Sequence, residues 1–396
     1  MTGLLANRRA FVAAALTVLL TLVAVEATIR VAFDPDGLDE WSADAFLAHE
    51  RDDHGRLLSE VVAIQAGERP EAGRLIMIGG STIREGLVPD GVIQQALDAE
   101  LGPQVPDVHT LYSFDQSMAE TARIALNLPL EAGDTVVIGI NPRRFGFGDD
   151  TLTQEFRASR LSLLPADDVA DLVASDTVDS ARPKPSGISG RIDDLGESVA
   201  FSPWDETAAF EHRLFLRQWV EGRLSSDTTT AWSDLFAGRL TDVDWGALTD
   251  TSFRDIRRPV RYGYGNQPLA DTEKAELAAI VAETRVDDYF AHHDLDFAIA
   301  TALADSIRAT GAEVVFLELP RTSLSVEAYG PVWADYDAAV EALVATTDSS
   351  RIDLRSEPFG DDDFFDLEHL LAPGRPRLTD AVFSALIGTD LGLEAE

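Results

Sequence analysis

The chain has 396 residues and a formal net charge of −37, from 69 acidic and 32 basic side chains. Hydrophobic residues make up 45% of it, which is a globular composition, while the acidity argues against a nucleic-acid partner. The sequence contains no cysteine, and this excludes disulfides, thiolate metal sites and a cysteine nucleophile.

The N-terminus predicts a membrane-associated segment. Two arginines (8–9) precede an uncharged apolar run at 10–25, which as a helix would rise about 24 Å. The run extends further if Glu26 and Arg30, four positions apart, pair at the far interface. We expect 1–33 to be a signal anchor with a cytoplasmic N-terminus and an extracytoplasmic remainder. The alternatives are a cleaved signal peptide, which gives a secreted form, and a buried core helix.

The next part of the chain changes from mainly polar to mainly apolar residues. Segment 34–70 is charged, and we interpret it as a juxtamembrane linker with one helix. From residue 71, apolar runs typical of strands buried on both faces alternate with helical patterns. The predicted elements are strands at 75–78, 108–114 and 135–140, and helices at 43–66, 92–101 and 117–128.

The pattern breaks at 146–285, where short amphipathic pieces lie among many Asp, Thr and Ser residues, and we predict a mainly helical insertion. It resumes over 286–396. The predicted elements there are helices at 286–310, 333–345 and 375–387, and strands at 313–319 and 351–354. Strands alternating with helices predict an α/β fold, with a parallel sheet sandwiched by helices and built from 71–145 and 286–396.

Gly79-Gly80-Ser81 follows the first predicted strand, at the edge where open α/β sheets bind ligands. A serine there can present its hydroxyl above the strand ends. The structural alternative is an N-cap serine. The G-x-S-x-G elbow of lipases is absent, because Ile83 replaces the second glycine. Arg84 follows closely, so it either lines the cleft or lies on the surface.

A second candidate group is Asp366-Leu-Glu-His369, just before the last predicted helix. An Asp three residues before a His can accept a hydrogen bond from Nδ1–H and leave Nε2 as the base for a serine. The alternative is a surface pair in an acid-rich loop that also contains 361–363.

No metal or cofactor is expected. His292 and His293 are neighbours in a predicted helix, so their side chains diverge by about 100° and do not easily share one ion. The acidic run 361–363 lacks the spacing and the glycine of an EF-hand, and we interpret it as a solvated loop.

In combination these segments resemble the SGNH, or GDSL-like, hydrolase superfamily, over about 67–145 and 286–390. The matching blocks, in the order that the family has them, are Gly80-Ser81, Gly139-Ile140-Asn141 and Asp366-x-x-His369. The likeness implies a flavodoxin-like parallel sheet. Two departures stand out: the stretch 110–117 lacks the glycine of the second block, and Pro142 replaces the Asp common after the block-III Asn. A backbone N–H from 113, 114 or 115 would then serve the oxyanion.

The resemblance implies acyl transfer on an ester. Ser81 would attack the carbonyl, with His369 as general base and Asp366 orienting it. The Ser81 N–H and the Asn141 side chain would hold the oxyanion, and Gly80 and Arg84 are the expected substrate contacts.

The predicted anchor adds a likeness in architecture to proteins that O-acetylate alginate or other exported polysaccharides, and to the SGNH partner in teichoic-acid D-alanylation. The expected substrate is therefore an acyl ester of cell-surface or exported glycan, cleaved by an esterase or formed by an O-acyltransferase. The same likeness suggests a multi-spanning membrane partner that donates the acyl group.

Two other hypotheses stay open. The missing glycine favours a catalytically inactive SGNH-like scaffold, or a glycan-binding protein of a cell-envelope export complex. A third possibility is a plain anchored α/β domain in which Ser81 is only a helix cap. The distance between Ser81 Oγ and His369 Nε2 discriminates among them.

Overall fold

The computed structural model describes residues 69–147, apart from 103, 104 and 114, and residues 267–388, together with Leu172 and single positions between 17 and 65. The chain divides into two compact units. Nearly all described residues belong to the unit made of Glu50–Arg157, Leu164–Pro183 and Phe253–Glu396, which we call the α/β body.

Five parallel strands form one sheet in the order β2-β1-β3-β4-β5. The strands are β1 (Arg74–Gly79), β2 (Asp107–Tyr112), β3 (Thr135–Ile140), β4 (Glu313–Glu318) and β5 (Ser350–Asp353). All six residues of β1 are buried, as expected of a strand covered on both faces. Gly79 pairs with Tyr112, and Ile78 with Ile138, so residues that follow β1, β2 and β3 emerge at one edge of the sheet.

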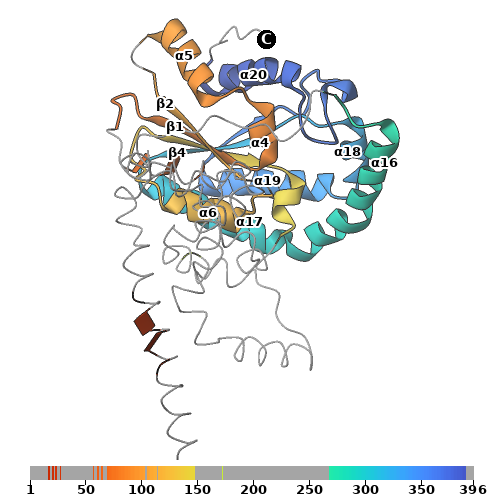
Figure 1. Cartoon of the computed structure of the whole chain (residues 1–396), viewed down its shortest axis with the longest axis horizontal. Helices are drawn as coiled ribbons and strands as arrows, with labels where there is room; N and C mark the ends of the chain where they lie inside the picture. The colour runs from red at the N-terminus through yellow and green to blue at the C-terminus, as the bar shows by residue number, and fades with distance from the viewer. Residues whose placement is uncertain are drawn as a thin grey trace, which may run out of the picture. The chain divides into compact units, whose positions relative to one another are not determined.

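Helices cover both faces of the sheet (Figure 1). One layer contains α4 (Ser81–Gly86), α5 (Asp90–Leu101) and α20 (Arg375–Ile387), and the other contains α6 (Met118–Leu126), α17 (Val286–Ala309) and α19 (Trp333–Thr347). The shorter connections are η2 (Pro142–Phe145), α16 (Asp271–Ile280), the π-helix η5 (Val281–Arg285), α18 (Ser323–Ala328), η6 (Asp361–Asp363) and η7 (Ala372–Gly374).

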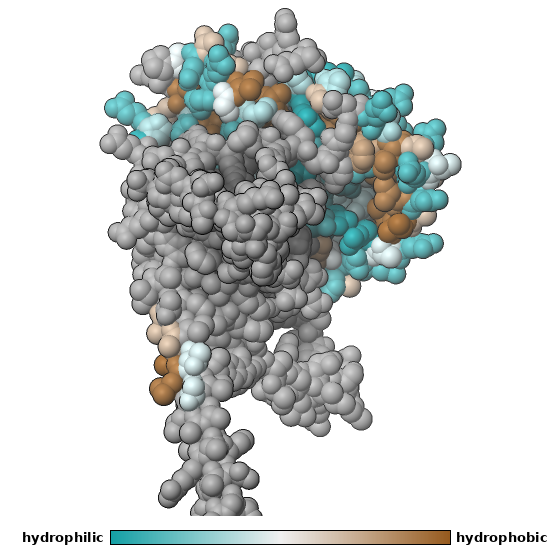
Figure 2. Space-filling model, viewed as in Figure 1, coloured by the Kyte–Doolittle hydropathy of each residue, from teal (hydrophilic) through white to brown (hydrophobic). Residues whose placement is uncertain are grey.

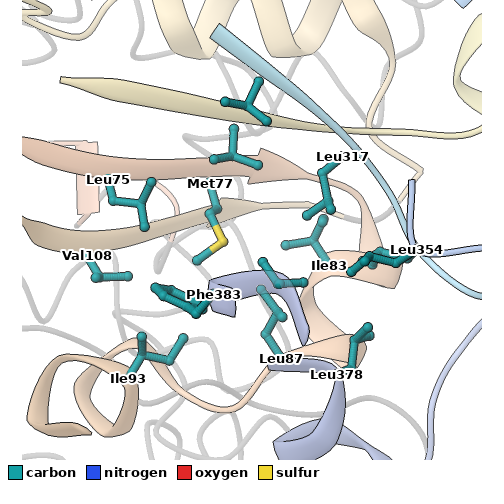
Figure 3. Close-up of a cluster of buried hydrophobic side chains, with 14 of the residues drawn as sticks. Leu75, Met77, Ile83, Leu87, Ile93, Val108, Leu317, Leu354, Leu378 and Phe383 are labelled. Atoms are coloured by element: carbon teal, nitrogen blue, oxygen red, sulfur yellow. The ribbon is translucent and has the colours of Figure 1, made fainter. Parts of the chain in front are cut away.

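The core under α4, α5 and α20 is a continuous cluster of buried aliphatic and aromatic side chains, including Met77, Leu317 and Phe383 (Figure 3). Burial of each such side chain contributes about 1.5–3 kcal/mol relative to exposure. Ile83 of α4 belongs to this cluster and is 1% exposed. A Cβ on Gly79 or Gly139 would overlap the Ile83 side chain, so the two glycines allow α4 to pack directly on the ends of β1 and β3.

The surface of the α/β body is mixed in polarity. Large apolar side chains that stay exposed among the described residues are spread over several helices, for example Val92 on α5, Phe290 on α17 and Val326 on α18. Figure 2 shows hydrophobic and hydrophilic residues side by side on the coloured part of this face.

The predicted α/β class with a parallel, helix-covered sheet is confirmed. The predicted helices at 286–310 and 375–387 match α17 and α20 to within a residue at each end. One expectation was incomplete: helical structure begins at Asp271, inside the predicted insertion, and continues through η5 into α17.

Other predictions fall mostly or wholly outside the described residues. Most of the predicted anchor (1–33) and of the linker helix (43–66) is among them, as are residues 148–266 of the insertion apart from Leu172. Among the residues that are described, no helix combines the length and the apolar character needed to cross a membrane.

A buried histidine ties the amino-terminal half of β2 to the segment before β1. His109 is 2% exposed, with Nδ1 at 3.3 Å from Glu60 Oε2 and Nε2 at 3.1 Å from Asp107 Oδ2. Burial opposes the charge on this imidazole, but the hydrogen bonds to Asp107 and Glu60 outweigh it and raise the pKa of His109 above its usual 6.5.

This arrangement predicts a pH-dependent stability. Because the folded-state pKa of His109 is raised, its stabilising contribution is complete below the unfolded pKa and is lost as pH rises through the folded value. Between about pH 6 and about pH 9, the natural chain should lose more free energy of unfolding, measured in urea, than His109→Gln loses. Equal losses of unfolding free energy in the two proteins would show that His109 does not cause the pH dependence.

Candidate active site

Ser81 is the first residue of α4 and lies just beyond the carboxyl end of β1. The N-cap of α4 is Gly80, which has extended backbone angles and makes no capping bond. Ser81 is therefore not the cap that the alternative interpretation required. Its hydroxyl contacts His369, in a loop 288 positions farther along the chain.

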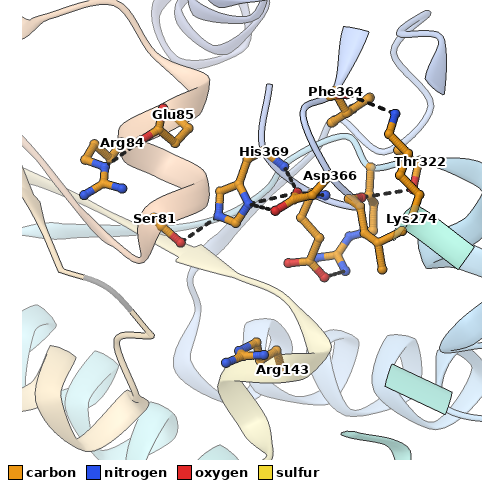
Figure 4. Close-up of polar contacts among 12 residues, drawn as sticks. Ser81, Arg84, Glu85, Arg143, Lys274, Thr322, Phe364, Asp366 and His369 are labelled. Atoms are coloured by element: carbon orange, nitrogen blue, oxygen red, sulfur yellow. Dashed lines mark hydrogen bonds and ion pairs between the residues drawn. The ribbon is translucent and has the colours of Figure 1, made fainter. Parts of the chain in front are cut away.

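Three side chains form a hydrogen-bonded series (Figure 4). Ser81 Oγ lies 2.7 Å from His369 Nε2. The other ring nitrogen, Nδ1, lies 2.8 Å from Oδ2 and 2.9 Å from Oδ1 of Asp366. A carboxylate only accepts hydrogen bonds, so the ring proton belongs on Nδ1 and the Nε2 lone pair faces the serine hydroxyl. The structure thus brings together the two groups that the sequence singled out separately.

Asp366 is held in its ionised form. Burial alone would raise the pKa of this carboxyl, but its hydrogen bond to His369 and the N–H groups that donate to it from Glu368 and His369 keep the pKa below the ordinary value. Those two N–H groups lie 2.9 Å and 3.0 Å from Oδ1. The carboxylate therefore shapes the turn that carries His369 and also orients the ring.

Lys274 of α16 fixes the loop that carries His369. Its ammonium donates to the carbonyl of Asp361 at 2.9 Å and to that of Phe364 at 3.1 Å, and the residue is 4% exposed (Figure 4). The N–H of Leu269 donates to the Phe365 carbonyl at 2.7 Å. Sequence reasoning had placed Lys274 in the insertion, and nothing in the local pattern connected it with the Asp/His pair.

The segment after β4 makes further polar contacts with the same loop. Both the N–H and the hydroxyl of Thr322 donate to the carbonyl of Leu367 at 3.1 Å. Arg321 pairs with Glu368 at 3.1 Å, and both side chains are largely buried. His369 is therefore fixed by contacts from two separate parts of the chain.

Asn141 lies at the end of β3, where it caps η2. Its Oδ1 accepts the N–H of Arg144 at 3.1 Å, which orients the side-chain amide. The residue is 6% exposed and lines the same pocket as Ser81. With Oδ1 engaged by the helix, Nδ2 is the group that remains to donate.

The stretch 110–117, which lacks the expected glycine, has one residue with a positive φ among those described. Asp115 has φ 46°, a backbone conformation that glycine adopts most readily, and it lines the pocket. The N–H of Ser113 is occupied, because it donates to the carbonyl of Gly79 at 3.2 Å. This removes Ser113 from the candidate oxyanion donors, and Phe114 lies outside the described residues.

The two predicted substrate contacts differ in position. Gly80 lines the pocket, whereas Arg84 does not. Arg84 is 3% exposed, and its Nε lies 2.9 Å from Glu85 Oε1. Glu85 in turn accepts from Arg375 at 2.9 Å, which joins α4 to α20. Arg84 is therefore part of the packing between α4 and α20 and does not line this pocket, so the structure does not support the predicted substrate contact.

The pocket above the sheet edge has a volume of about 330 Å³ and is open to Ser81 and His369. Sequence reasoning missed several of its walls: Arg143, Phe147, Leu277, Ile280, Val281, Arg285 and Tyr329. Arg143 had a usable signal, since it stands two residues after Asn141. The others come from distant segments whose convergence no local pattern reveals.

This arrangement can deprotonate a hydroxyl and stabilise the resulting imidazolium, which is the chemistry of nucleophilic catalysis by serine. Within the described ranges, no group of three or more His, Asp or Glu side chains is arranged to hold a metal ion. Comparison with protein-family models found no match, and comparison with curated proteins found no similar sequence.

The contacts of Lys274 predict a stability effect. Lys274→Met would leave two buried carbonyls without their donor and should lower the free energy of unfolding by about 1–3 kcal/mol in urea titrations. Arg308→Met, which removes an exposed cation paired only with Asp348 on the surface, is the control and should change it by less than about 0.5 kcal/mol. Equal effects would show that Lys274 does not hold the loop.

Proposed function

We propose that the protein is a serine esterase or O-acyltransferase of the SGNH type. The observation that carries the proposal is the 2.7 Å contact between Ser81 Oγ and His369 Nε2, with Asp366 behind the ring. Two further observations support it. Asn141 lines the same pocket, and the matching blocks leave β1 and β3 at the same sheet edge.

In the proposed mechanism, His369 Nε2 takes the hydroxyl proton of Ser81 as Oγ attacks the ester carbonyl carbon. Asp366 remains ionised and stabilises the imidazolium. The tetrahedral intermediate collapses when His369 returns the proton to the leaving alcohol, and an acyl-serine forms. Water then releases a carboxylic acid, or a sugar hydroxyl accepts the acyl group.

The oxyanion needs donors at the sheet edge. In α4 the first N–H with an acceptor inside the helix is that of Ile83, which bonds to Gly80, so the N–H of Ser81 precedes the helical ladder. Together with Nδ2 of Asn141 it can point at a developing negative charge. Each donor comes from the end of a different strand, and this spacing suits a carbonyl bound between β1 and β3.

The proposed substrate is an acyl ester of cell-surface or exported glycan, and the proposed location is the outer side of a membrane. Both rest on the apolar run behind Arg8 and Arg9 and on the likeness to anchored polysaccharide O-acylation proteins. For a transferase, a multi-spanning membrane protein would supply the acyl group. The alternative, a catalytically inactive scaffold, is less favoured, because such a protein needs no hydrogen bond between Ser81 and His369.

The first functional prediction concerns the nucleophile. Ser81→Ala should reduce hydrolysis of 4-nitrophenyl acetate to the uncatalysed rate and abolish labelling by a fluorophosphonate probe, because both need Oγ. Ser306→Ala, a change on the distant helix α17, is the matched control and should keep both signals. Equal activity of the natural and Ser81→Ala proteins would exclude the proposed role of Ser81.

The second functional prediction concerns stabilisation of the oxyanion. Asn141→Asp keeps an oxygen to cap η2 but loses the Nδ2–H donor, so it should lower kcat by at least ~10² at unchanged folding stability. Steady-state kinetics and urea unfolding on the same preparation separate the two effects. An unaltered kcat would mean that Asn141 acts only as a helix cap.

A further inference from the structure

A buried phenol faces the pocket beside the candidate triad. Tyr329 is 1% exposed and lines the pocket. Burial is the main cause that raises the pKa of Tyr329, so the phenol stays protonated and can donate.

Several charged side chains surround the phenol. Arg143, Arg285 and Arg321 act on it electrostatically, and the carboxylate of Glu368 acts in the opposite sense and more strongly than any one of them. Arg321 is neutralised by Glu368 at 3.1 Å, and Arg143 by Asp115 at 2.6 Å. Of these three arginines, Arg285 has the most distant carboxylate partner, Asp288 at 3.4 Å.

Arg285 is weakly paired within its own helix. Its Nη1 lies 3.4 Å from Asp288 Oδ2, and the two side chains are 31% and 45% exposed. An exposed pair of this kind contributes little, because both groups remain hydrated. Asp288 is not a wall of the pocket, whereas Arg285 is.

Arg285 also ends an unusual segment. It is the last residue of η5, a π-helical turn between α16 and α17. π-Helical turns are rare and concentrate at functional sites. Both ends of this turn, Val281 and Arg285, line the pocket, and Leu277 and Ile280 of α16 add an apolar wall next to it.

We propose that the pocket binds an acyl ester that carries a carboxylate, and that this carboxylate lies between Arg285 and Arg143 and accepts a hydrogen bond from Tyr329. The planar fork of a guanidinium matches a carboxylate, and the apolar wall of Leu277 and Ile280 accommodates the carbon skeleton. The inference rests on the proposed function, because that function places the ester carbonyl at Ser81. Asp115 and Glu368, which both act electrostatically on Arg143, favour a singly charged group over a dianion.

The test measures binding to the full-length chain carrying Ser81→Ala, purified in a mild detergent, by titration calorimetry. One pair of probes, 4-acetoxybenzoate and its neutral methyl ester, places the charge on the alcohol side of the ester. A second pair, mono(4-nitrophenyl) succinate and 4-nitrophenyl butyrate, places it on the acyl side. In one pair the charged probe should bind about tenfold more tightly, and this preference should weaken as salt is added.

Variants in the Ser81→Ala background locate the charge. Arg285→Gln should remove the preference, and Tyr329→Phe, which keeps the ring, should reduce it several-fold. Arg308→Gln, which removes a surface cation paired with Asp348, should leave it intact. Equal affinity for charged and neutral probes, no binding of any probe, or an equal loss with Arg308→Gln would each overturn the inference.

Failure of this inference differs from failure of the proposed function. Turnover of neutral 4-nitrophenyl acetate by the natural chain, without any preference for charged esters, would reject the carboxylate subsite and keep the esterase. A charge preference in binding, with no turnover of any ester, would reject the esterase and keep the subsite.

Discussion

The packing of Ile83 against two glycines is the constraint on which the site depends. A side chain at Gly79 or Gly139 would occupy the space of Ile83 and push α4 away from the sheet. With glycine at both positions, α4 starts immediately after β1, and Ser81 projects from its first turn. The same Gly139 precedes Asn141 by two residues, so one close contact between a helix and a sheet sets the positions of two candidate functional groups.

The histidine is positioned in a different way, by polar contacts with its loop. Hydrogen bonds to its carbonyls come from Lys274 on one side and Thr322 on the other, while Asp366 accepts two N–H groups within the turn. Backbone groups in an irregular loop need partners when they are buried. Satisfying them from two distant segments also leaves His369 in one orientation, with Nε2 toward Ser81.

The charges near the site contrast with those of the whole chain. Although the protein carries a net charge of −37, its pocket collects arginines around a buried phenol. Most of them are committed to carboxylates at the pocket wall, such as Arg143 to Asp115, which limits the local field. The electrostatic character of the pocket is therefore set by individual pairings and cannot be read from the overall charge.

The sequence by itself determined the α/β class and the identity of the candidate triad. Long apolar runs followed by glycine predict buried parallel strands, because helices on both faces leave no polar side to a strand. Serine after the first strand and Asp-x-x-His before the last helix were also visible locally. Arg84, in contrast, is buried and does not line the pocket, because adjacency to Ser81 in sequence does not fix which way a helical side chain points.

Only the tertiary structure decided whether those candidates meet, and which other residues join them. Ser81 and His369 are 288 positions apart, and their contact depends on the register of β1 and β3 and on the loop held by Lys274. Tyr329 follows α18 and Arg285 ends η5, and neither segment contains a motif that marks these residues. Periodicity and short motifs report local conformation, whereas a pocket is made by long-range packing among segments far apart in the chain.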